Sequence, residues 1–246
     1  MIGQDSFQHT MPVSPRQQVL GQAAEMILEI KEPHPIRVAV DGVDAAGKSF
    51  FADELGHVLV NRKASVIRSS IDYFHFPRQR RHARYGSESP LGYYEDSFDY
   101  AKVRQCLLDP LGPGGNRAYR QRAFDFQTDT EIQSPWMTAP LDAILVFDGI
   151  FLLRPELADC WDLSIFLDIP FELSAQRASE RLRDRSLFGD TEQVRERYRK
   201  RYIPGQQIYF DRCQPQQRAD VIIDNQDLER PRILGGRWFE GKDSLR

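Results

Sequence analysis

The sequence is short of cysteine, of net charge and of long apolar runs, and each shortage excludes a class of protein. It has three cysteines in 246 residues and no CxxC pair, which argues against a disulfide framework or a structural zinc site and favours a reducing compartment. The 33 basic and 36 acidic residues leave a formal charge of −3, so we expect no nucleic acid and no membrane as partner. No apolar run approaches the roughly 18 residues of a membrane span, and residues 1–15 lack the basic and apolar segments of a signal peptide. These absences predict a soluble, cytoplasmic protein.

What the sequence does contain is a series of short apolar runs that alternate with helical patterns. The runs that we interpret as strands are 36–40, 64–70, 143–147, 163–169 and 220–224. The helical patterns are 15–32, 48–62, 98–111, 171–186 and 190–202, the first of which begins after a Ser14-Pro15 cap. Such alternation is typical of a parallel sheet between two layers of helices. We therefore predict an α/β fold, a three-layer parallel sheet with helices on both faces.

A long segment without a clear period follows the second apolar run. Residues 71–96 are polar, aromatic and basic, with proline and glycine breakers among them. Loops of this length inside a compact domain are usually functional. We expect an acceptor-binding or simply solvated loop, because the negative net charge disfavours RNA as its partner. Residues 117–139 are expected to form a small hairpin-like insertion.

Residues Gly42 to Ser49, GVDAAGKS, match the phosphate-loop pattern G-x-x-x-x-G-K-[ST] at every required position. The glycines let the backbone curl so that its N–H groups point at phosphate oxygens, and the helix that follows adds a favourable dipole. Lys48 is expected to neutralise the β- and γ-phosphates, and the Ser49 hydroxyl to hold Mg²⁺. The predicted nucleotide-binding residues are Gly42, Asp44, Ala45, Ala46, Gly47, Lys48, Ser49 and Phe50. A tight turn with an exposed lysine would also fit, and phosphate loops serve GTPases, motors and switches as well as kinases.

Two aspartates at the ends of predicted strands are candidates to complete a transfer site. Asp72 follows the second run directly. In open α/β sheets the ligand crevice lies beyond the carboxyl ends of the strands, so Asp72 faces the phosphate loop if its strand neighbours 36–40, and it could accept a proton from an acceptor hydroxyl. Asp148 ends the third run and can reach Mg²⁺ through water, as in a Walker-B arrangement. By position alone, each could also be an ordinary structural aspartate.

Arginines crowd the last two helical patterns. Arg177, Arg181 and Arg185 recur along one helical face, with Arg183 offset from it. One or two of them could cover the phosphates as a lid, although a solvated face explains any single arginine better. We interpret the segment 195–202, RERYRKRY, as a solvated face.

Several separated segments together resemble one family. They are the phosphate loop, SSIDYFHFPR (69–78), SPLGYYEDSFDY (89–100), LVFDGIFLLRPEL (145–157), IFLDI (165–169), RASERLRDR (177–185) and ADVIIDN (219–225). In this order they resemble the uridine kinase-like P-loop kinases, a group that also holds pantothenate kinase and phosphoribulokinase. The resemblance implies the P-loop nucleoside triphosphate hydrolase fold with a small lid and an acceptor-binding insertion. It divides the chain into an N-terminal arm and helix (1–32), a P-loop kinase domain (33–226) and a C-terminal tail (227–246).

The resemblance implies a role for each matching position. Asp72 looks like the aspartate that takes the proton from a nucleoside 5′-hydroxyl, and Asp96 looks like the carboxylate that grips the ribose hydroxyls. Asp148 matches the acidic residue near magnesium. Phe124 stands where a tyrosine near the base is common, and Arg183 matches a lid arginine.

The remaining substrate-binding candidates are two aromatic residues. His75 stands where a tyrosine is common in the family, and Tyr93 is one of several aromatics that could stack on a base. Uridine kinases carry a histidine a few residues after the aromatic position that Phe124 occupies. This sequence departs from them, because it reads QTDTE (127–131) there and has no histidine. Lid arginines of the family are likewise replaced by Phe188 and Asp190. The transfer machinery is thus matched more closely than pyrimidine recognition.

We therefore predict an ATP-dependent small-molecule kinase that uses ATP and Mg²⁺. Asp72, Lys48 and Arg183 are the predicted catalytic residues, with Ser49 and Asp148 around the metal. The expected acceptor is the 5′-hydroxyl of uridine or a related nucleoside. A sugar or a pantothenate-like alcohol as acceptor, a nucleotide-binding regulatory switch, and a homo-oligomer stay open.

Overall fold

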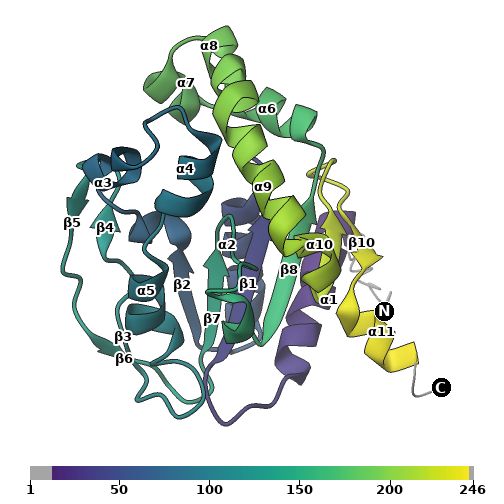
Figure 1. The fold of residues 1–246 in the computed structure, drawn as a ribbon. Helices are drawn as coiled ribbons and strands as arrows, with labels where there is room; N and C mark the ends of the chain where they lie inside the picture. The colour runs from purple at the N-terminus through teal and green to yellow at the C-terminus, as the bar shows by residue number, and fades with distance from the viewer. Residues whose placement is uncertain (1–12, 244–246) are drawn as a thin grey trace, which may run out of the picture.

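The structure, a computed structural model, describes residues 13–243 (Figure 1). The arm predicted for residues 1–13 therefore lies almost wholly outside the described residues. The side chain of Arg183, one of the predicted catalytic residues, also lies outside them.

A six-stranded sheet with the order β10-β9-β8-β1-β7-β2 forms the centre of the described chain. Its strands are β1 (Ile36–Gly42), β2 (Val66–Ser70), β7 (Ile144–Asp148), β8 (Leu163–Asp168), β9 (Val221–Asp224) and β10 (Arg232–Gly235). Neighbouring strands are parallel except for β10, which runs antiparallel to β9. The five predicted strands are confirmed. The sheet is mostly rather than wholly parallel, because the C-terminal segment adds an edge strand.

Helices cover both faces of the sheet. The longer ones and those that follow β8 and β9 are α1 (Pro15–Glu29), α2 (Lys48–Asn61), α6 (Phe171–Glu180), α7 (Leu182–Phe188), α8 (Thr191–Arg197), α9 (Ile203–Cys213), α10 (Pro215–Arg218) and α11 (Arg237–Asp243). Val38 and Val40 of β1 belong to one buried cluster with side chains of α1 and α2. Ala39, between them, belongs to a second cluster with Tyr209 of α9. Since successive side chains of a strand point to opposite faces, the three-layer arrangement is confirmed.

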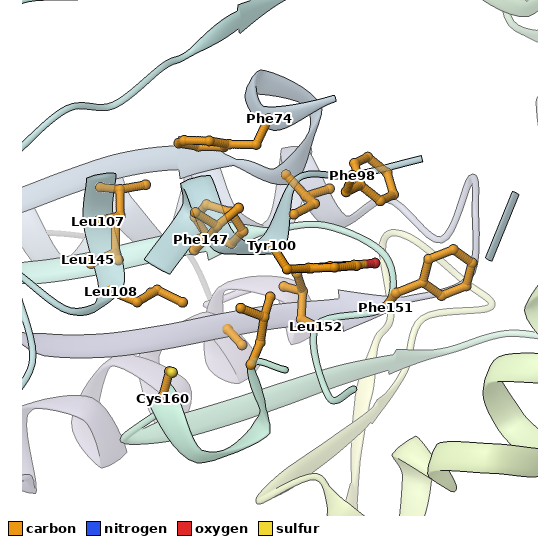
Figure 2. Packing of buried hydrophobic residues seen from close by; sticks show 14 of the residues in the cluster. Phe74, Phe98, Tyr100, Leu107, Leu108, Leu145, Phe147, Phe151, Leu152 and Cys160 are labelled. Atoms are coloured by element: carbon orange, nitrogen blue, oxygen red, sulfur yellow. The ribbon is translucent and has the colours of Figure 1, made fainter. Parts of the chain in front are cut away.

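The second cluster is rich in aromatic side chains. Figure 2 shows Leu145 and Phe147 of β7 close to Phe74 and Leu107. The Phe74 and Phe147 ring centroids are 6.3 Å apart. All of these side chains are fully or almost fully buried. This packing attaches the segments after β2 to the sheet, close to the carboxyl end of β7.

Helix α1 begins as its sequence predicts. Ser14 Oγ accepts a hydrogen bond from Gln17 N (3.2 Å), and Gln17 Oε1 accepts one from Ser14 N (3.1 Å). This reciprocal pair is a capping box, and Pro15 occupies the first helical position. The helix ends at Glu29, earlier than predicted, because Pro33 and Pro35 cannot continue it.

The prediction of a loop for residues 71–96 is wrong, because most of this segment is helical. A 3₁₀ turn (Ile71–Phe74) is followed by α3 (Arg78–Ala83) and α4 (Pro90–Asp96). The breakers lie at the helix ends: Pro77 caps α3, and Ser89 Oγ accepts a hydrogen bond from Gly92 N (3.1 Å) at the start of α4. The proline and glycine residues of this segment therefore mark boundaries between short helices.

Short elements complete the insertion between β2 and β7. Helix α5 (Tyr100–Val103) continues into a π-helical turn, Arg104–Leu108. The predicted hairpin-like region forms two two-stranded sheets, in which β3 (Ala118–Tyr119) pairs with β6 (Met137–Thr138) and β4 (Phe124–Asp125) with β5 (Thr130–Glu131). Among the helices of residues 13–243, none has both the length and the apolar character that crossing a membrane requires.

Candidate active site

A cavity of about 690 Å³ opens where the phosphate loop meets the segment that follows β2. Strand β1 carries the phosphate loop at its carboxyl end, and its neighbours β7 and β8 lie on its two sides. Such a crevice beyond the carboxyl ends of parallel strands is the usual ligand site of an open α/β sheet. The predicted site residues that line it are Asp44, Ala45, Gly47, Lys48, Ser49, Phe50, Asp72, His75, Tyr93 and Asp148.

The backbone of the phosphate loop requires its two glycines. Gly42 has φ +146°, and a Cβ there would lie 2.6 Å from the carbonyl oxygen of Leu167. Gly47 has φ +90° and forms the cap of α2. Only glycine adopts such angles without strain. The loop therefore ends with the N-terminus of α2, whose free N–H groups and dipole favour a bound phosphate.

Lys48 lies folded across the loop that it belongs to. Its Nζ donates a hydrogen bond to the carbonyl oxygen of Val43 (2.7 Å). Burial lowers the pKa of Lys48, while the nearby carboxylates of Asp44, Asp41 and Asp148 act in the opposite direction. The ammonium thus lies near three acidic groups at the loop. There it could release the Val43 carbonyl oxygen and donate a hydrogen bond to a phosphate oxygen instead.

Ser49 and Asp148 meet as the sequence predicts for a metal site. Ser49 Oγ donates to Asp148 Oδ2 (2.6 Å), and Asp148 is 2% exposed. Arg68 Nη2 binds the other carboxylate oxygen at 2.9 Å. A hydroxyl and a carboxylate beside a phosphate loop suit Mg²⁺, which prefers oxygen ligands and shares them with phosphates and water. No group of three or more metal-ligating side chains occurs in the described chain, so a metal here would need oxygens from the nucleotide.

Asp44 joins the loop to three helices. Its amide donates to Gln206 Oε1 (2.8 Å), and its carbonyl accepts from Ser174 Oγ (2.6 Å). Tyr93 OH donates to its carboxylate at 2.8 Å. Burial, and then the charge of Asp44, raises the pKa of Tyr93 well above its ordinary value. The sequence motif predicted Asp44 only as a loop residue, and no local signal announces these distant partners.

Asp72 and His75 lie on the other wall of the cavity. The 3₁₀ turn that carries Asp72 begins at Ser70, whose Oγ accepts a hydrogen bond from Asp72 N (3.4 Å). His75 Nδ1 is 3.0 Å from the Asp72 carbonyl oxygen. Strand β2 does not neighbour β1, the condition under which we expected Asp72 to face the phosphate loop, since β7 lies between them. Asp72 still lines the cavity, because β2 and β7 are parallel and end at the same edge of the sheet.

Two predicted substrate-binding residues do not line this cavity. Asp96, at the end of α4, is 3.8 Å from Arg84, and its Oδ2 is buried without a hydrogen-bond partner in the described chain. Phe124 is 2% exposed and packs in the core. Phe126, two residues further along, does line the cavity, and its ring centroid is 4.7 Å from that of His75. The predicted roles of Asp96 and Phe124 stay predictions.

The lid region contributes two residues whose side chains the structure describes. Arg181 and Asp184, which flank Arg183, both line the cavity. Gly42 and Ala46, two of the predicted nucleotide-binding residues, are buried and do not line the cavity. The Ala46 carbonyl oxygen accepts a hydrogen bond from Asn225 Nδ2 (2.6 Å).

The solvated face predicted for 195–202 is wrong at two positions. Tyr198 is 4% exposed and Arg201 is 6% exposed, and both line the cavity. Val194, Tyr198, Arg201 and Gly205 are spaced as one helical face, and all four are buried. This spacing is the signal that could have identified Arg201. Its charge favoured the solvated interpretation instead.

Solved structures share this architecture. No protein-family model and no curated protein sequence matches the chain. A structure described as a possible uridine kinase from Bacillus stearothermophilus is 22% identical, with a TM-score of 0.66 over 84% of this chain and 97% of that one. A candidate fructose transport system kinase from Silicibacter sp. TM1040 is 21% identical, with a TM-score of 0.65 over 78% and 94%. The D-glycerate 3-kinase of Cryptococcus neoformans var. grubii is 13% identical, with a TM-score of 0.55 over 88% and 98%.

The chain has the fold of the P-loop kinases. The predicted P-loop fold is thereby confirmed. In this P-loop kinase fold the loop 42–49 links β1 to α2, and Asp148 ends the adjacent strand β7. The segment between β2 and β7 contributes further residues to the lining of the same cavity.

Proposed function

We propose that the protein is an ATP-dependent phosphotransferase of the uridine kinase-like group, acting on a hydroxyl of a small molecule. The observation that carries this proposal is that the phosphate loop and Asp72 line the same cavity. The three structural neighbours described above support it, because their descriptions name a possible uridine kinase, a fructose transport system kinase and a D-glycerate 3-kinase. The proposal assigns catalysis to residues 33–226 and the protein to the cytoplasm.

Each side chain has a simple task in this proposal. The loop amides and Lys48 bind the β- and γ-phosphates. Ser49 and Asp148 would hold Mg²⁺, which would neutralise charge on the phosphates. Asp72 accepts the proton of the acceptor hydroxyl as its oxygen attacks the γ-phosphorus. The bond from that phosphorus to the bridging oxygen breaks, and ADP leaves. Arg181, at the end of α6, is a candidate to cover the phosphates beside Arg183. Catalysis then rests mainly on positioning and charge neutralisation.

The predicted acceptor, the 5′-hydroxyl of uridine or a related nucleoside, remains part of the test. Asp96, the residue predicted to bind the ribose hydroxyls, does not line the cavity, so its position does not support a nucleoside as the acceptor. A sugar or a pantothenate-like alcohol therefore belongs beside nucleosides in the panel of acceptors.

An acceptor screen with γ-labelled ATP tests the proposal. The assay must detect the phosphorylated product, because a measurement of ADP release would also report ATP hydrolysis by a nucleotide switch. We expect transfer to at least one hydroxyl compound, and its loss in Lys48→Met. ATP binding with slow hydrolysis but no transfer to any acceptor would contradict the proposal.

A further inference from the structure

Arg201 is a buried cation without a counter-charge. It is 6% exposed, lies in the π-helical turn Tyr198–Tyr202 and lines the cavity. In the described part of the chain it has no carboxylate within ion-pair distance, and its Nε has no hydrogen-bond partner. Its one hydrogen bond there joins Nη1 to Tyr202 OH at 3.4 Å. Burying an uncompensated charge costs stability, so an anion from outside the chain would complete this site.

The surroundings of Arg201 strengthen its positive field. The rings of Tyr93 and Tyr202 lie 5.4 Å and 5.2 Å from its guanidinium carbon, and such rings attract a cation without neutralising it. Burial lowers the pKa of His82, and the charges of Arg201 and Arg81 lower it further. The charges of Arg201 and Arg81 therefore act on the same part of the cavity. The acidic groups that face it are Asp44, which accepts a hydrogen bond from Tyr93 OH at 2.8 Å, and Asp184, which also lines the cavity.

Contacts connect this positive wall with the acceptor side. His75 follows Asp72 and packs on Phe126, and the Arg81 guanidinium carbon lies 5.0 Å from the Phe126 ring centroid. Arg81 already pairs with Asp129 at 3.3 Å, which leaves Arg201 as the buried guanidinium with capacity for a ligand. At the phosphate loop, the charges that act most on Lys48 are Asp44, Asp41, Asp148 and Arg181. The cations thus form two groups, Lys48 and Arg181 at the phosphate loop, and Arg201 and Arg81 around His82.

We propose that the acceptor carries an anionic group, a carboxylate or a phosphate, in addition to the hydroxyl that is phosphorylated, and that Arg201 binds this group. This inference rests on the proposed function and narrows it to anionic hydroxyl compounds. A guanidinium suits both anions, because its N–H groups match two oxygens at once. Asp72 takes the hydroxyl proton as before, so Arg201 has no part in the bond changes.

Paired acceptors that differ only in charge test the inference. Glycerate against glycerol and ribose 5-phosphate against ribose separate the effect of an anion from that of the hydroxyl, with uridine as the neutral nucleoside. We expect kcat/KM for the preferred anionic compound to exceed that of its neutral partner by about 10- to 100-fold, as the loss of a charge-assisted hydrogen bond implies. Equal or better transfer to uridine or to the neutral partners would overturn the inference while the proposed function stands.

Variants at Arg201 locate the effect. Arg201→Gln should raise KM for the anionic acceptor by about 10- to 100-fold and leave KM for ATP unchanged, and Arg201→Lys should retain part of the affinity. Arg199→Gln is the matched control, since Arg199 lies in the same turn but is exposed and pairs with Glu196 at 2.6 Å. A raised KM for ATP with an unchanged KM for the acceptor would assign Arg201 to the nucleotide and overturn the inference.

Calorimetry distinguishes failure of the site from failure of the reaction. Glycerate and ribose 5-phosphate are titrated into the wild type and Arg201→Gln, each saturated with Mg²⁺ and a non-hydrolysable ATP analogue. Binding that Arg201→Gln abolishes supports the anion site even if no compound is phosphorylated, in which case the proposed function alone fails. Absence of binding in the wild type overturns the inference. Thermal melts control for folding: Arg201→Gln should melt no lower than the wild type without ligand, because it removes an uncompensated charge.

Discussion

Replacement of Arg68 tests how the protein holds the carboxylate beside Ser49. Arg68 lies on β2 and bridges two acids, Asp148 at 2.9 Å and Asp53 at 2.8 Å. Asp148 is almost completely buried, whereas the Arg68 side chain is 26% exposed. Arg68→Met would leave the Asp148 carboxylate with its hydrogen bonds from Ser49 and Ser70 and no ion pair. We therefore expect loss of stability in the free protein.

The magnitude follows from burial. Breaking a fully buried ion pair by removing one partner costs roughly 3–5 kcal/mol, and the partial exposure of Arg68 screens the interaction. We expect the free energy of unfolding to fall by about 2 kcal/mol in Arg68→Met, or roughly 4–8 °C in melting temperature for a chain of this size. Saturating Mg²⁺ and ATP analogue should narrow the difference, because the metal would supply the positive charge that Asp148 has lost.

Thermal and urea unfolding with and without Mg²⁺ and analogue measure both effects. Arg62→Met is the matched control, since Arg62 pairs with Glu25 at 3.2 Å on the surface and its loss should cost no more than about 0.5 kcal/mol. If Arg68→Met behaves like Arg62→Met, the buried ion pair contributes no special stability. If Mg²⁺ and nucleotide leave the difference unchanged, Asp148 is not near the metal.

Three further changes have defined outcomes. Burial raises the pKa of Asp41 to about 6, so its favourable contribution to the free energy of unfolding is complete below pH 4 and is lost as pH rises through 6. Urea titrations at a series of pH values should show the free energy of unfolding falling by up to about 3 kcal/mol over this range. Asp41→Asn should lack this fall, and equal pH dependence in both proteins would refute the prediction. Lys48→Met should lower kcat for labelled-phosphate transfer by about 10²- to 10³-fold, and retention of near wild-type turnover would be inconsistent with its role. Gly42→Ala should lower stability by about 2 kcal/mol, because its Cβ meets the Leu167 carbonyl oxygen at 2.6 Å; an unchanged urea midpoint would show that the loop can shift.

The features predictable from the sequence are those that short stretches determine. Buried parallel strands appear as apolar runs, as β1 and β7 do, because both of their faces are covered. The phosphate loop is recognisable because its function depends on eight consecutive residues. Strand β10 was missed because a four-residue, half-exposed edge strand has little apolar character.

The features that the sequence does not predict depend on tertiary contacts. The strand order, with β7 between β1 and β2, follows from the path of the whole chain. Arg201 was assigned to solvent because its charge outweighed the helical spacing that buries it. Likewise, packing sets which side chains of α4 reach the cavity, and it directs Tyr93 there while Asp96 lies near Arg84.

The central claim is that the phosphate loop holds a phosphate in order to transfer it to a hydroxyl near Asp72. Asp72→Asn tests this claim most directly, with the labelled product and the ATP affinity measured on the same preparation. We predict a fall in kcat for transfer of about 10²- to 10⁴-fold with unchanged ATP binding. Transfer at the wild-type rate in Asp72→Asn, or an absence of transfer in the wild type with intact ATP binding, would contradict the account.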